Sequence, residues 1–162
     1  MSTSVTRISW LAAFLFCLCL AEARIASAAG AVEMGVERIV VQTIDQYNEA
    51  MQTGDPQPWL RYFTDNVRRH SPLADQTGSK EFAEYYDWEF KTFQARYVTK
   101  KILVSGRSTA VTFDWEGIHK PTGTPVKLEM VAIYEMASSG RFESVSFYFD
   151  TAKVAALFAG SK

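Results

Sequence analysis

The apolar positions in the first part of the chain repeat with the period of a helix. A helix is predicted from about residue 32 to 52, with its apolar face formed by Val36, Val40, Ile44, Tyr47 and Met51. Gly54 ends this helix, and Asp55 caps a short second helix that begins at Pro56. Ser79 caps a third helix, whose stripe is Phe82, Tyr86, Phe90 and Phe93.

The pattern changes to strands in the second half of the chain. A short strand over 66–71 precedes the third helix, and four longer strands rich in β-branched and aromatic residues follow it. These cover 97–104, 110–118, 126–136 and 142–149, and turn-forming sequences separate them. Helices followed by consecutive strands indicate an α+β fold. We expect a strongly bent antiparallel sheet wrapped around the first helix, a cone with an open mouth.

The N-terminus has the pattern of a signal peptide. Arg7 precedes an uncharged, mostly apolar run from Ile8 to Leu20, and Ala26-Ser27-Ala28 is a small-x-small cleavage pattern. We expect cleavage after Ala28, a domain over residues 29–162, and a secreted or periplasmic protein. An uncleaved anchor is the alternative. Both cysteines lie within this segment, so the mature chain has none and needs no disulfide framework.

Composition excludes several classes of function. The net charge is −1, whereas nucleic-acid binding favours a basic surface. Two histidines and no mature cysteine argue against a zinc site, and the chain has no phosphate-binding glycine loop, so we expect no cofactor and no metal. Eleven Phe, seven Tyr and four Trp either fill a core or line a pocket for an apolar ligand.

Three stretches resemble one known family. Residues 47–55 read Y-x-x-A-x-x-x-G-D, and Phe63-Thr64-Asp65 is followed by His70-Ser71-Pro72. Pro121-Thr122-Gly123 precedes Gly140-Arg141 and Tyr148-Phe149-Asp150. In this order they resemble the SnoaL-like branch of the nuclear transport factor 2-like superfamily. The resemblance implies a cone of three N-terminal helices packed on a strongly bent, mostly antiparallel sheet. It does not fix the function, because this superfamily contains both enzymes and binding modules.

The same resemblance suggests catalytic residues. Tyr47 corresponds to the tyrosine that hydrogen-bonds the substrate in ketosteroid isomerase, or is simply core. The two carboxyl positions of that enzyme hold Ser71 and Ala132, which disfavours its mechanism here. In SnoaL-like cyclases an aspartate at the position of Asp150 acts as acid and base, although a helix cap is the alternative reading.

Further residues are candidates for the pocket. His70 is a third catalytic candidate; if Ser71 faces the cavity, alternation turns His70 away and brings Arg69 inward. Asp150 would share a strand face with Ser146 and Tyr148. Arg69 and Tyr148 are ligand-binding candidates. Further ligand-binding candidates, which also have a core reading, are Trp88, Trp115, Tyr86 and Tyr134.

Three functions remain open. The first is a cofactor-free cyclase or isomerase that acts on a small, apolar, oxygenated molecule. The second is a non-catalytic binder that uses the same cavity. The third is a dimerising module, because we expect a homodimer through an exposed row of Val145, Phe147 and Phe149. No membrane contact is expected after signal cleavage.

Overall fold

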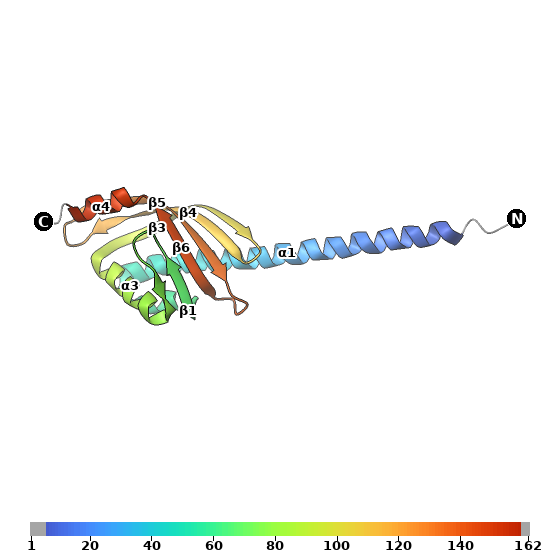
Figure 1. The fold of residues 1–162 in the computed structure, drawn as a ribbon, viewed down its shortest axis with the longest axis horizontal. Coiled ribbons are helices and arrows are strands. Elements are labelled where there is room, and N and C mark those ends of the chain that lie inside the picture. Colours follow the sequence, from blue (N-terminus) through green and yellow to red (C-terminus); the bar gives the residue numbers. More distant parts are fainter. Residues whose placement is uncertain (1–5, 160–162) are drawn as a thin grey trace.

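The computed structural model describes the backbone of residues 6–159 and the side chains of residues 30–155. Its elements follow the predicted order, helices first and the long strands after them (Figure 1). They are α1 (Thr6–Thr53), α2 (Gln57–Leu60), β1 (Phe63–His70), β2 (Gln76–Thr77), α3 (Gly78–Thr92), β3 (Phe93–Ser105), β4 (Ser108–His119), β5 (Thr124–Met136), β6 (Phe142–Phe149) and α4 (Thr151–Ala159). The α+β prediction is confirmed.

Helix α1 is longer than the predicted helix. It runs without a break over 48 residues and ends, as expected, just before Gly54. Its buried face from Val36 to Met51 is the predicted stripe. The first half of α1 extends away from the rest of the molecule (Figure 1). The side chains of the predicted signal peptide lie outside the described part, and its cleavage stays a prediction. Among the described residues, no helix is both long and apolar enough to cross a membrane.

One curled six-stranded sheet, in the order β2-β1-β6-β5-β4-β3, forms the wall of the cone. Strands β3 to β6 form the predicted antiparallel meander. Strand β1 pairs in parallel with β6. The edge strands are β2 and β3, so the chain crosses from one edge of the sheet to the other through α3. Helix α1 packs against β3, and α3 packs against β1. The helices thus fill the concave side of the sheet (Figure 1).

The bend depends on a close approach of β3 and β4. A Cβ atom at Gly117 would lie 2.2 Å from the carbonyl oxygen of Gln94, so only glycine fits without moving backbone. A register shift between Thr99 and Lys101 marks a second irregularity in β3. Bulges and glycines of this kind increase the curvature of a sheet.

Several local predictions need correction. Helix α3 begins at Gly78 and its N-cap is Thr77, so Ser79 is not the cap. Helix α2 begins one residue after Pro56, although the Asp55 carboxylate accepts a hydrogen bond from the backbone N–H of Gln57 at 3.0 Å. Element ends are the least certain part of a sequence-based prediction, because capping groups compete.

The face predicted for the apolar row of β6 is wrong. Val145 is fully buried and Phe147 is 2% exposed, so both lie on the inner face with Phe149, whereas Tyr148 is 47% exposed on the outer face. Residues of β6 alternate between the two faces as predicted, but the apolar row faces inward instead of outward. Burying this row removes far more apolar surface from water than burying Ser144, Ser146 and Tyr148 would. The homodimer stays a prediction, but it cannot use this row.

Candidate active site

A cavity opens between α3 and the concave face of the sheet. Seven of its thirteen lining residues are aromatic, and they are Tyr85, Trp88, Phe93, Tyr97, Trp115, Phe147 and Phe149. Leu73 and Trp88 are partly exposed and form its rim. Arg69 and Glu89 are the two charged side chains among the described residues of its lining. The chemistry of the cavity therefore centres on these two groups.

Glu89 projects from α3 into the cavity and is 6% exposed. The Tyr47 hydroxyl donates a hydrogen bond to its Oε1 atom, and the Trp115 indole N–H donates to the Tyr47 oxygen at 3.0 Å. Burial raises the pKa of the Glu89 carboxyl above its usual value, and the hydrogen bonds from Tyr47 and Tyr85 and the charge of Arg69 offset only part of this effect. Glu89 is a carboxyl group whose protonated form is favoured by its surroundings.

Sequence reasoning missed Glu89, although the sequence contained a signal. The stripe of α3 runs through Phe82, Tyr86 and Phe90, and Glu89 follows Tyr86 by three positions. Residues three apart on a helix share a face, so Glu89 had to lie at the edge of the buried stripe. A carboxyl group in that position is rarely buried without a partner or a function.

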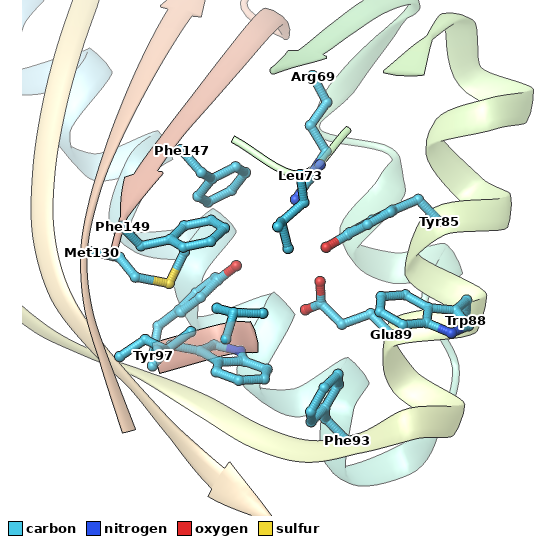
Figure 2. Close-up of a pocket in the computed structure, with 13 residues that line it drawn as sticks. Arg69, Leu73, Tyr85, Trp88, Glu89, Phe93, Tyr97, Met130, Phe147 and Phe149 are labelled. Atoms are coloured by element: carbon cyan, nitrogen blue, oxygen red, sulfur yellow. The ribbon is translucent and has the colours of Figure 1, made fainter. Parts of the chain in front are cut away.

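Arg69 enters the cavity from β1, opposite α3. Figure 2 shows its side chain between Tyr85 on one side and Phe147 on the other. Its guanidinium carbon lies 3.8 Å from the centre of the Tyr85 ring and 5.1 Å from that of Phe147, as in cation–π contacts. The prediction that an inward Ser71 brings Arg69 inward and turns His70 outward is confirmed, because Arg69 and Ser71 are buried and His70 is exposed.

Tyr47 is central but does not face the cavity space. Its ring is fully buried and stacks on Tyr97, with 4.0 Å between ring centres. Burial and the neighbouring Glu89 carboxyl raise the pKa of its hydroxyl well above its ordinary value, so it stays a hydrogen-bond donor. Its hydroxyl acts on Glu89, so any effect on a ligand passes through that carboxyl group.

The structure places the other two catalytic candidates elsewhere. Asp150 is exposed, and its carboxylate accepts the backbone N–H of Ala152 at 2.9 Å, which is the helix-cap reading. His70 is on the outer face, with Nδ1 2.6 Å from the Asp75 carboxylate. Tyr148 lies beside His70, with 6.3 Å between the ring centres. None of the three lines the cavity. Their catalytic and ligand-binding roles stay predictions that these positions do not support.

The four aromatic candidates divide evenly. Trp88 and Trp115 line the cavity. Tyr86 and Tyr134 are buried in the core and do not line it, and Tyr134 packs on Phe142 with 5.1 Å between ring centres. Aromatic residues on the inner face of a curled sheet fill the core where the sheet closes and line a pocket where it opens.

This arrangement favours proton transfer in a dry, aromatic environment. A buried carboxyl group with a raised pKa holds a proton at a higher pH than an exposed one, and it can release or regain that proton. Tyr47 and Trp115 fix its position, which is what a general acid or base requires. Arg69 adds a positive charge across the same space.

Comparisons with known proteins agree with this architecture. A family model described as the SnoaL-like domain matches residues 44–145. SalBIII, an epoxide hydrolase/cyclase-like enzyme in pyran ring formation in the polyether salinomycin, is 20% identical over 75% of this chain and 95% of its own, with a TM-score of 0.67. The comparison with curated proteins found no match.

Two further solved structures share the fold. A nuclear transport factor 2-like protein from Anabaena variabilis is 15% identical over 72% of this chain and 90% of its own, with a TM-score of 0.64. Another, from Burkholderia pseudomallei, is 20% identical over 72% and 95%, with a TM-score of 0.63. At these identities the likeness establishes the cone fold and leaves the chemistry to the residues of the cavity.

Proposed function

The chain belongs to the SnoaL-like domain family, and we propose that it binds a small, largely apolar, oxygenated molecule and transfers a proton on it through Glu89. The reaction class is that of a cofactor-free cyclase or isomerase. One observation carries the proposal: the Glu89 carboxyl is buried among aromatic side chains with a raised pKa and a fixed hydrogen-bond partner. SalBIII, an epoxide hydrolase/cyclase-like enzyme, has the same fold.

The residues around Glu89 divide the work. Tyr47 donates a hydrogen bond that stabilises the Glu89 carboxylate once its proton has left, and Trp115 holds the Tyr47 hydroxyl in place. The aromatic walls exclude water, which strengthens electrostatic interactions inside the cavity. A ligand oxygen or an acidic C–H group near Glu89 would then exchange a proton with this carboxyl group.

The test begins with the ligand. Native mass spectrometry of the protein from its own host identifies a co-purified molecule, and its conversion is then measured with wild type and Glu89→Gln. Loss of a positioned acid–base group lowers the rate by about 10²- to 10⁴-fold. Asp150→Asn is the matched control, because asparagine caps a helix about as well as aspartate. Near-normal turnover by Glu89→Gln would exclude the proposed role.

A non-catalytic binder is the second candidate. It is favoured by the small number of ionisable groups in the cavity, where Glu89 is the only carboxyl group among the described lining residues. In that case the co-purified molecule binds to wild type and to Glu89→Gln, and neither protein converts it.

We also propose that the protein is exported, to the periplasm or beyond. The support is the uncharged run from Ile8 to Leu20 followed by Ala26-Ser27-Ala28. N-terminal sequencing of protein from the native host should give a mature start at Ala29. A start at Met1 would contradict export with cleavage.

A homodimer is proposed through the outer face of the sheet instead of the inner row. Leu103 and Ile133 are exposed there and lie in one cross-strand row, joined through Ala110 on β4. Ile133→Glu should yield monomers in light scattering, because a buried charge would face the same apolar row of the second copy. A dimer that survives this change would place the interface elsewhere.

A further inference from the structure

Arg69 carries a buried charge without a direct counter-ion. Its side chain is 4% exposed, and among the described residues no carboxylate oxygen lies within 4.0 Å of its nitrogens. Nη1 donates to two neutral acceptors, the Ser71 hydroxyl at 3.2 Å and the Gln76 amide oxygen at 2.8 Å. The Nε–H is buried and has no hydrogen-bond partner. A buried cation in this state is unfavourable unless something else pairs with it.

Glu89 does not supply that pairing. Its carboxyl is engaged by Tyr47, and burial favours its protonated form. An arginine guanidinium stays protonated in proteins, and the rings of Tyr85 and Tyr86 lie 3.8 and 5.8 Å from its central carbon, as in cation–π contacts. Arg69 therefore stays charged, and its side chain reaches the cavity from β1 (Figure 2).

The shape of the space restricts what can reach the Arg69 side chain. The cavity encloses about 60 Å³ for solvent and about 540 Å³ when measured out to its open mouth. A space of this size favours a small molecule built on a single ring. Phe147, Phe149 and Tyr97 present apolar surface to such a ring. A flat, apolar body with one anionic group at the Arg69 end matches both features.

We infer that the cavity selects a small aromatic or cyclic carboxylate, and that Arg69 holds its carboxylate group. This rests on the proposed small-molecule function and names the class of ligand. A guanidinium presents parallel N–H donors that match the two oxygens of a carboxylate. The stacked Tyr85 ring keeps the guanidinium plane in place before the ligand arrives. Ser71 and Gln76, which hold Nη1, are positioning residues.

The test compares charged probes with neutral ones of the same shape. Benzoate and phenylacetate are titrated at neutral pH against benzamide and phenylacetamide, with binding followed by ligand-observed NMR. Wild type should bind each carboxylate at least about tenfold more tightly than its amide, since hydrogen bonds to charged groups are the stronger ones. Arg69→Gln should abolish the preference. Arg68→Gln is the matched control, because Arg68 is the neighbouring, exposed arginine on β1.

Each outcome decides the inference. Equal or tighter binding of the amides by wild type, or no signal from either carboxylate at tens of millimolar, would overturn it without any need for a folded variant. A preference that survives in well-folded Arg69→Gln would overturn the assignment to Arg69. Loss of turnover is a separate readout: Glu89→Gln should keep the carboxylate preference, so the acid–base role and the ligand class can fail independently.

Discussion

Charged side chains form direct ion pairs on the outer face of the sheet but not in the cavity on its inner side. On the outer face, Lys100 and Lys127 contact Asp114 at 2.6 and 3.1 Å, and Lys127 also contacts Glu116 at 2.7 Å. On the inner side, Arg69 and Glu89 are both buried at the same cavity and form no such direct pair. Both regions belong to one small domain with a net charge near zero.

The difference indicates where function lies. Asp114 is 6% exposed, as Glu89 is, but two lysines at the surface neutralise its charge directly, so the outer network needs no ligand to explain it. Buried charged groups without direct partners lower stability and persist only where something compensates them. Arg69 and Glu89 are therefore the better candidates for functional groups, and the aromatic side chains around them form walls for a ligand.

Two carboxyl groups express the same contrast in their titration. Hydrogen bonds from Lys100 and Lys127 lower the pKa of Asp114, whereas burial raises that of Glu89. Asp114 stabilises the fold above its unfolded-state pKa, and this contribution is lost as the pH falls. Glu89 behaves in reverse: its protonated form favours folding at low pH, and this contribution is lost as the pH rises through its raised pKa.

The largest loss of stability is expected from Phe147→Ala in β6, with the adjacent Tyr148 as the control position. Phe147→Ala should destabilise the protein by about 3–5 kcal/mol, because a buried phenylalanine is removed and a cavity remains. Tyr148→Ala, one residue further along, should change stability by less than about 1 kcal/mol, because Tyr148 faces outward. Urea denaturation of both variants measures the difference. Similar losses at the two positions would contradict the assignment of faces.

Tyr47→Phe should have the next largest effect. It removes the hydrogen bond from Tyr47 to the buried Glu89 carboxyl and leaves the Trp115 indole N–H without its acceptor, at a cost of about 1–3 kcal/mol. The loss should be greater at high pH than at low pH, since the ionised carboxylate needs the donor most. Denaturation curves of wild type and Tyr47→Phe, recorded from acid to alkaline pH, measure this difference in stability. A loss independent of pH would mean that the effect is one of packing.

Glu89→Gln and Asp114→Asn should change the pH dependence of stability in opposite directions. Above the raised pKa of Glu89 the wild type buries a charge and the variant does not, so the variant should gain stability relative to wild type as the pH rises. Asp114→Asn is the control and should show its largest deficit at neutral pH, with the deficit fading in acid. Parallel profiles for the two variants would refute the opposite signs.

The smallest effect is expected from the outer network. Lys127→Met removes contacts with Asp114 and Glu116, and the resulting change in stability should be the smallest of the four. It should disappear in 1 M salt, where screening acts over about 3 Å. Thermal melts at low and high salt give the measurement. A large, salt-independent loss would show that this face is more than a solvated surface.

Local sequence patterns determined the elements of this protein. The stripe from Val36 to Met51 determined which face of α1 is buried, because a helix places every third or fourth residue on one side. The alternation in β6 determined that Phe147 and Tyr148 face opposite sides. The capping of α4 by Asp150 could also be predicted from the sequence, because the carboxylate accepts a hydrogen bond from an N–H only two residues away.

Only the tertiary structure decided which side of the sheet became the inside and which groups met there. The phase of β6 is set when its apolar row packs against the helices, and no pattern within the strand contains that information. Glu89, Tyr47 and Trp115 come from α3, α1 and β4, and they meet only because the sheet curls around the helices. Their hydrogen bonds span 42 and 68 residues of sequence. Periodicity is a property of neighbours along the chain, whereas this site is made by burial between distant segments, where removal from water sets the charge of a carboxyl group.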